Sequence, residues 1–143
     1  MEQNRRFEET LDQIKDHLID NITNRESKRG LKAYGLNVLD LMSGKGRSAK
    51  VMYKWWNANM SKRVKTDGTL WLVDYSNAML EQAKTEKFET NPQVNTYLHC
   101  VKTLDWNVFN TKFDVVIGWW NLCYLRTEAE MQNYVKGLRQ VLA

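Results

Sequence analysis

The chain has 143 residues, which is the size of one ordinary domain. Hydrophobic residues make up 43% and charged residues 27%, so a largely disordered chain is excluded. The net charge of +4 falls short of the basic surface expected of a dedicated nucleic-acid-binding protein. No apolar run is long enough to span a membrane, and the charged N-terminus lacks the apolar stretch of a secretory signal. We therefore expect a cytoplasmic or nuclear protein with no membrane partner.

Apolar residues at helical spacing predict an amphipathic helix over residues 5–23, and a polar linker follows it to residue 35. The apolar positions of this helix are Phe7, Leu11, Ile14, Leu18 and Ile22. We treat residues 1–35 as an N-terminal helix and linker, and residues 36–143 as the remaining domain.

In residues 36–143, short apolar runs alternate with helical patterns. The runs at 36–41, 70–74, 94–100 and 113–119 predict strands, and the segments 47–61, 77–88 and 127–142 predict helices. This alternation is typical of parallel βαβ units. The predicted fold class is therefore α/β and Rossmann-like, a partial doubly wound sheet of four parallel strands in the order 3-2-1-4 with flanking helices.

Two helices carry recognisable starts. Ser76 is the predicted N-cap of the helix at 77–88, and Thr127 with Glu130 forms a capping box for the last helix. The first of these helices is expected to turn Met79, Leu80, Ala83 and Phe88 inward. The inner face of the last helix is expected to hold Met131, Tyr134, Val135, Leu138, Val141 and Leu142.

The turn after the first strand carries the chemistry. Asp40 ends that strand, and the loop Ser43-Gly44-Lys45-Gly46 leads into a helix whose free N–H groups favour a carboxylate or phosphate. Asp74 ends the second strand, where a carboxylate can accept both hydroxyls of a ribose. Together they indicate a nucleoside-bearing cofactor, although a GxG turn also occurs in plain α/β connections. A generic nucleotide-binding Rossmann protein therefore stays open as an alternative.

These motifs resemble those of a known class of enzymes. Residues 38–47 (VLDLMSGKGR) resemble motif I of class I S-adenosylmethionine-dependent methyltransferases, residues 72–84 resemble the acidic motif and helix that follow, and residues 113–120 resemble the fourth strand. The GxGR turn, the acidic VDYS turn and the QAK helix are most similar to the α-amino protein N-terminal methyltransferases. The resemblance implies S-adenosylmethionine as the cofactor and a protein or peptide N-terminus as the methyl acceptor, and makes a nucleic-acid acceptor unexpected.

The resemblance also implies a role for each matching position. Gly44 and Gly46 let the amino-acid end of the cofactor pass, Arg47 pairs with its carboxylate, and Asp74 holds the ribose. The remaining implied cofactor-binding residues are Asp40 in motif I, Tyr75 and Ser76 beside the adenine, Asp105 in the loop that starts at Lys102, and Trp119 and Trp120 over the cofactor and the substrate entry. No catalytic residue and no metal ligand is identified.

Two departures from the family pattern bear on function. Met42 replaces the first glycine of motif I, and a left-handed backbone there costs of order 1 kcal/mol or more. The family continues into three more strands, whereas this chain ends at Ala143, so we expect a C-terminally truncated, cofactor-binding half. The alternative is a non-catalytic methyltransferase-like subunit that serves as a structural or binding module. Its apolar fourth strand would form a sheet edge, which favours a protein partner or self-association.

Other conspicuous residues are expected to be structural. Trp55 and Trp56 have the spacing of core residues, and His99 has no partner pattern that indicates catalysis. Cys100 and Cys123 lack CxxC spacing, so we expect two buried thiols and no disulfide or metal site.

Overall fold

The computed structural model describes residues 2–28, 35–60, 68–118 and 121–143. Its four strands form one parallel sheet in the order β3-β2-β1-β4, which confirms the predicted α/β fold. The helices and strands along the chain are α1 (Glu2–Lys28), β1 (Val38–Leu41), α2 (Arg47–Met60), β2 (Thr69–Asp74), α3 (Asn77–Ala83), β3 (Gln93–Leu98), β4 (Val115–Ile117) and α4 (Glu128–Val141). Short 3₁₀ turns η1 (Val101–Thr103) and η2 (Trp106–Val108) follow β3, and η3 (Asn121–Tyr124) follows β4.

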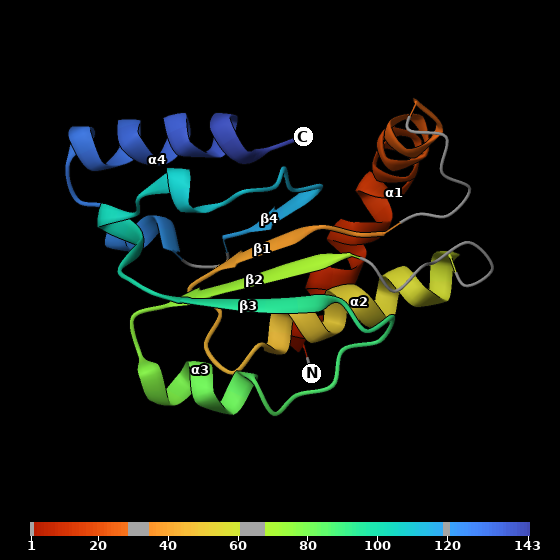
Figure 1. Ribbon diagram of the computed structural model, residues 1–143, viewed down its shortest axis with the longest axis horizontal. Coiled ribbons are helices and arrows are strands. Elements are labelled where there is room, and N and C mark those ends of the chain that lie inside the picture. Colours follow the sequence, from red (N-terminus) through yellow and green to blue (C-terminus); the bar gives the residue numbers. More distant parts are fainter. Residues whose placement is uncertain (1, 29–34, 61–67, 119–120) are drawn as a thin grey trace.

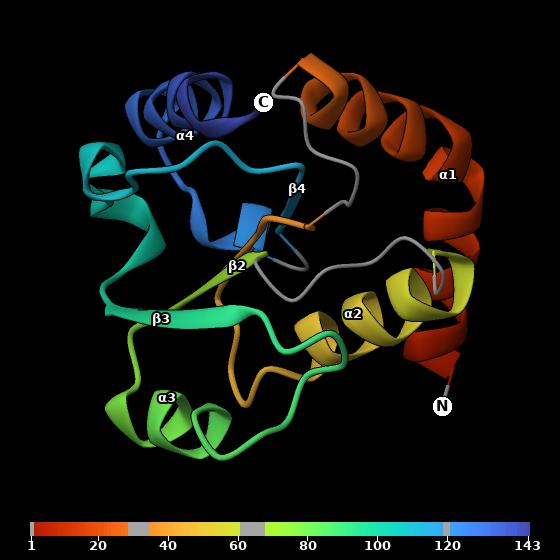
Figure 2. The same cartoon turned by 45° about the vertical axis from the view of Figure 1, so that its right-hand side comes forward.

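The sheet lies between two layers of helices (Figure 1), and a second view shows α1 beside α2 (Figure 2). Successive residues of a strand face opposite sides, so β1 serves both layers. Val38 joins the core cluster beneath α1, α2 and α3, whereas Leu39 and Leu41 join the cluster beneath α4 and η2. This two-sided burial explains why the first strand reads as a nearly continuous apolar run.

The tryptophans of α2 pack the first layer, as predicted. Trp56 is fully buried, and the Trp55 indole N–H donates to a carboxylate oxygen of Asp12 at 2.8 Å, which links α2 to α1. A second polar contact anchors the far end of α1, where Arg25 pairs with the carboxylate of Asp114 just before β4. Helix α1 is therefore part of the core of this domain.

Aromatic rings fill the second layer. Trp106 lies edge-on to Phe109 and Tyr134, with ring centroids 6.2 and 5.9 Å apart. Helix α4 comes very close to Trp106 at Gly137, where an added Cβ would lie 2.0 Å from a carbon of the indole ring. Only a glycine fits at this helix position in the observed packing.

Several expectations about helix faces are wrong. Helix α3 ends at Ala83 and is followed by a turn at Lys84 and Thr85, so it is shorter than the predicted helix at 77–88. Met79 is 37% exposed. Phe88 is buried as expected, although it lies beyond the helix. In α4 the buried residues are Tyr134, Gly137 and Val141, and the first two lie against Trp106. The predicted inner-face residues Met131, Val135 and Leu142 are exposed.

The capping predictions are confirmed, whereas the prediction of buried cysteines is wrong. The Ser76 hydroxyl accepts from the Met79 N–H at 3.3 Å, and the Thr127 hydroxyl accepts from the Glu130 N–H at 3.1 Å. Cys100 and Cys123 are both exposed, because they lie in the connections that follow β3 and β4 rather than in the strands.

The fourth strand is shorter than predicted. Only Val115–Ile117 pairs with β1, and Phe113 forms a separate parallel bridge to Leu142. The expected sheet edge is present, since β4 is the last strand on its side. No helix in the described residues is long and apolar enough to cross a bilayer.

Candidate functional site

The carboxyl ends of β1 and β2 meet at a tightly turned loop. Three of its residues have a left-handed backbone: Met42 (φ 58°), Gly44 (φ 56°) and Gly46 (φ 83°). The Ser43 N–H donates to the Val73 carbonyl at 2.9 Å, so the loop is fastened to the end of β2 before it enters α2. The glycine-rich connection predicted from the sequence therefore lies at the edge of the sheet where ligands bind in open α/β folds.

The two glycines of this loop play different parts. A Cβ added at Gly44 would meet nothing within 4 Å, so Gly44 borders open space. A Cβ added at Gly46 would lie 3.3 Å from the ring of Phe88, so both the left-handed backbone and the packing favour glycine at this position. Of the two glycines expected to border the cofactor, Gly44 is the one that faces free space.

Asp74 holds the loop and the start of α3 together. One carboxylate oxygen accepts the Gly44 N–H at 2.8 Å, and the other accepts the Ser76 N–H at 2.9 Å. The residue is only 7% exposed. The structure thus brings together three of the predicted site residues, Gly44, Asp74 and Ser76, in one hydrogen-bonded unit.

Asp40 lies beneath the first turns of α2. Burial raises the pKa of its carboxyl group to about 8; a hydrogen bond from the Ala49 N–H opposes this rise, and the nearby charge of Asp74 adds to it. Among the described residues, no partner is found for Asp40 Oδ2 or for the buried hydroxyl of Ser43. Both atoms are buried at the base of the loop, where a polar atom without a partner is costly.

A cavity of about 200 Å³ opens beside this unit. Its lining comes from the loop after β1, the end of β2, the turn after β3 and the turn after β4, through Met42, Tyr75, Cys100, Val101, Lys102 and Tyr124. The volume is below the usual range for pockets that enclose a drug-sized ligand. The cavity is thus formed where four connections of the parallel sheet converge.

Other predicted site residues lie elsewhere or fall outside the description. Arg47 is exposed and lines a separate crevice of about 30 Å³ with Gln3 and Phe7 of α1. The Asp105 carboxylate accepts the Asn107 N–H at 3.0 Å and caps η2, and it does not line the cavity. Trp119 and Trp120 lie outside the described residues.

The cavity also contains residues that sequence reasoning did not assign to the site. The sequence marks Met42 only as a departure from the motif and predicts Cys100 to be a buried thiol, and it carries no prediction for Tyr124. The one available signal was position, since each follows the carboxyl end of a predicted strand. Lys102 was expected from the resemblance, and it does line the cavity.

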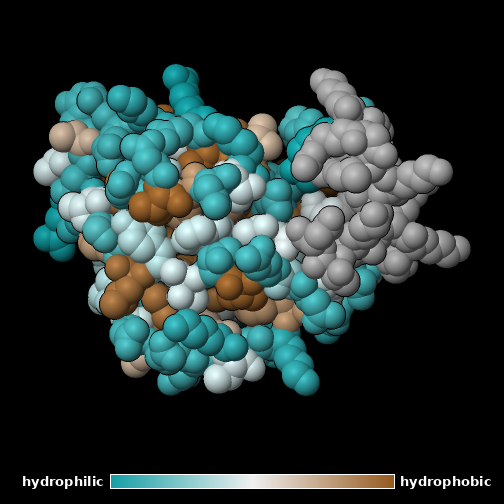
Figure 3. Space-filling view, in the orientation of Figure 1, coloured by the Kyte–Doolittle hydropathy of each residue, from teal (hydrophilic) through white to brown (hydrophobic). Residues whose placement is uncertain are grey.

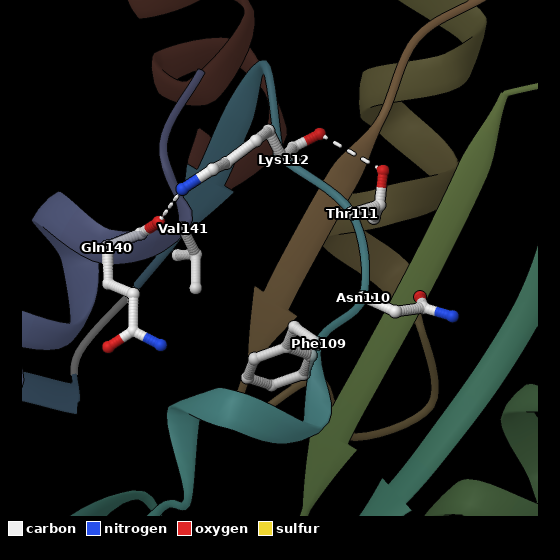
Figure 4. A pocket seen from close by; sticks show the side chains of 6 residues that line it. All are labelled: Phe109, Asn110, Thr111, Lys112, Gln140 and Val141. Carbon is white, nitrogen blue, oxygen red and sulfur yellow. Dashed lines mark hydrogen bonds between the residues drawn. The ribbon is translucent and has the colours of Figure 1, made fainter.

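A second cavity, of about 260 Å³, lies between the start of β4 and the end of α4 (Figure 4). The Lys112 amino group donates to the backbone carbonyl of Gln140, and the Phe109 ring forms part of the wall. This lysine satisfies a carbonyl at the carboxyl end of the helix, which is a structural role. The second cavity therefore offers weaker signs of ligand binding than the first.

Comparison with known proteins places the chain in a family. The family model described as a methyltransferase domain matches residues 38–143. The chain belongs to this methyltransferase-domain family. The match begins at the first residue of β1 and includes the loop, Asp74 and all four lining segments, so the cavity lies within the matched part.

Solved structures share the fold of this methyltransferase domain. An S-adenosylmethionine-dependent methyltransferase from Clostridium acetobutylicum has a TM-score of 0.57 at 19% identity and covers 87% of this chain and 44% of its own. A SAM-dependent methyltransferase from Leishmania major has a TM-score of 0.55 at 23% identity, with 90% and 48% covered. The glycopeptide N-methyltransferase MtfA, complexed with sinefungin, has a TM-score of 0.51 at 12% identity, with 86% and 44% covered.

These likenesses establish the Rossmann-like methyltransferase fold. The chain spans slightly less than half the length of each of these three proteins. No curated protein sequence matches the chain.

Proposed function

We propose that this methyltransferase domain binds S-adenosylmethionine at the carboxyl edge of its sheet and serves methyl transfer. The observation that carries the proposal is the unit formed by Gly44 and Asp74, whose 2.8 Å hydrogen bond joins the glycine loop to the end of β2 beside a cavity. S-adenosylmethionine, when bound, supplies a methyl group attached to a positively charged sulfur.

The described residues offer the groups such a cofactor needs. Gly44 borders open space at the loop, which leaves room for the backbone of an amino acid. The Asp74 carboxylate has about four acceptor sites and uses two for backbone N–H groups, so capacity remains for ribose hydroxyls. Tyr75, whose ring is 66% exposed, supplies a flat surface for the base.

Calorimetric titration with S-adenosylmethionine and S-adenosylhomocysteine tests the cofactor site. Asp74→Asn is the informative variant, because it keeps the shape and one acceptor, whereas alanine would leave both backbone N–H groups unpaired. We expect saturable binding that weakens by about tenfold in Asp74→Asn, the loss of one charge-assisted hydrogen bond. Asp16→Asn, on the exposed side of α1, is the matched control and should bind as the wild type does. A folded wild type that binds neither ligand would refute the proposal.

For the methyl acceptor we propose the α-amino group of a protein or peptide N-terminus. The support is the resemblance of the GxGR and VDYS turns to the α-amino protein N-terminal methyltransferases. An α-amino group has a pKa of about 7.7–8.0, so a part of it is neutral near pH 7.5 and can accept a methyl group once it is positioned. The localisation in the cytoplasm or nucleus stays a prediction.

Paired peptides test the acceptor. A peptide library with free N-termini is incubated with the chain and cofactor, beside the same peptides with acetylated N-termini, and methylation is followed by mass spectrometry. The proposal expects methyl groups only on free N-termini. Methylation of internal side chains in both sets would instead indicate another acceptor.

The second candidate function is a non-catalytic methyltransferase-like module that docks to another chain through β4. It is favoured by the edge position of β4, and the single-residue parallel bridge of Phe113 to Leu142 lies beside this edge. Met131 and Val135 leave apolar surface exposed on the neighbouring α4. The face of the molecule in Figure 3 exposes apolar side chains only in small separate groups among hydrophilic ones, so this face does not add support for a docking surface.

Sedimentation velocity over a wide concentration range tests this second candidate through self-association. We expect the sedimentation coefficient to rise with concentration, and Val116→Lys on β4 to reduce that rise. A monomer at every concentration, together with cofactor binding, would favour the first candidate.

A further inference from the structure

Met42 combines two features that seldom occur together. Its backbone is left-handed, with φ at 58°, and its side chain lines the cavity beside the glycine loop. A left-handed backbone is unfavourable for a residue with a side chain, and glycine adopts it freely. Strain of this kind is concentrated at functional sites, where the surrounding structure enforces it.

The bonds on either side of Met42 enforce its conformation. β1 ends at Leu41, the Ser43 N–H is fixed to the Val73 carbonyl at 2.9 Å, and the Gly44 N–H is fixed to Asp74 at 2.8 Å. The chain must therefore turn sharply at Met42. Its side chain is only partly buried against the second core cluster, so the core does not require a residue of this size.

We propose that Met42 is a specificity-determining residue of the cofactor pocket, whose side chain limits the room for the amino-acid end of the ligand. This inference rests on the proposed cofactor site. Met42 lies in the same loop as Gly44, which borders the open space proposed for the amino-acid end, so this is the end of the ligand nearest to Met42. Tyr75 also lines the cavity and directly follows Asp74, on the side proposed for the nucleoside end.

The side chain is suited to restrict space without closing the pocket. Methionine is unbranched and flexible, so it adapts to a ligand while still occupying volume. The cavity is small, at about 200 Å³, and Met42 is one of the six residues that bound it. Replacing the side chain by hydrogen enlarges the pocket on the side of the glycine loop and leaves the nucleoside side unchanged.

Calorimetric titration with two ligands distinguishes the contribution of the amino-acid end to binding from that of the nucleoside end. S-adenosylhomocysteine carries both the nucleoside and the amino-acid end, and adenosine carries the nucleoside alone. In Met42→Gly we expect the affinity for S-adenosylhomocysteine to rise about tenfold, the effect of one or two methylene groups in a pocket. The affinity for adenosine should change by less than about threefold, because the nucleoside contacts are kept. Met42→Ala, which retains a Cβ, should fall between wild type and Met42→Gly.

Thr90→Gly is the matched control. Thr90 also has a left-handed backbone, with φ at 67°, but it lies in the turn before β3 and does not line the cavity. The same relief of backbone strain at Thr90 should leave the affinity for both ligands unchanged.

Two results would overturn the inference. One is a folded Met42→Gly variant whose affinity for S-adenosylhomocysteine is unchanged or lower than that of the wild type. The other is an equal gain for both ligands, which would indicate a general change of the pocket. Failure of every folded variant to bind either ligand would overturn the cofactor site and the inference with it, so the two failures are distinguishable.

Discussion

Replacing Asp40 by asparagine should change how stability depends on pH. Because burial raises the pKa of Asp40 to about 8, the folded protein keeps a proton that the unfolded chain releases above about pH 4. The free energy of unfolding therefore falls as pH rises through this window, by at most about 1.4 kcal/mol per pH unit from this group. Asp40→Asn has no proton to release, so it removes this part of the slope.

Urea unfolding at pH 5 and pH 7, in the absence of ligand, measures the effect. We expect Asp40→Asn to gain about 2 kcal/mol relative to wild type between these two pH values. Asp16→Asn, which removes an exposed carboxyl of α1, should retain the wild-type slope. Equal slopes for the wild type and Asp40→Asn would refute the reasoning, because they would mean that burial does not hold Asp40 neutral.

Three further predictions concern packing and access. Gly137→Ala should destabilise the fold by about 2 kcal/mol in urea unfolding, because the new Cβ would lie 2.0 Å from the Trp106 ring. This clash outweighs the higher helix propensity of alanine. Unchanged stability would contradict the observed packing. Arg25→Met should lower the free energy of unfolding by about 3 kcal/mol, since it removes the cation that pairs with the buried carboxylate of Asp114. A decrease below about 1 kcal/mol would mean that this ion pair does not anchor α1. S-adenosylhomocysteine should slow the alkylation of Cys100 by iodoacetamide and leave the alkylation of Cys123 unchanged, because Cys100 lines the cavity. The two rates are measured by peptide mass spectrometry. Equal rates at Cys100 with and without ligand would mean that the ligand binds elsewhere.

The strands were predictable because their burial is two-sided. The runs that carry Asp40 and Asp74 near their carboxyl ends are apolar at nearly every position, and the structure places alternate residues of β1 in opposite core layers. The faces of α3 and α4 were less predictable. The helical spacing places Met131 and Val135 on the same predicted face as residues that are buried. Which side of α4 packs against the domain depends on the position of Trp106, and tertiary packing sets that position.

The candidate site was predictable where it depends on the backbone. Gly44 and Asp74 follow consecutive strands of a predicted sheet, so their proximity follows from the topology. The directions of longer side chains do not follow from it. Arg47 lines a crevice beside α1, and the Asp105 carboxylate accepts a hydrogen bond within its own turn. Cys100 and Tyr124 both line the cavity, because β3 and β4 end at the same edge of the sheet.

Amide hydrogen exchange with and without S-adenosylhomocysteine shows where on this methyltransferase domain the ligand binds. We predict slower exchange in three segments that surround the first cavity, at residues 42–46, 74–76 and 100–102. Unchanged exchange in these segments, or slower exchange confined to residues 109–112 beside the second cavity, would contradict it.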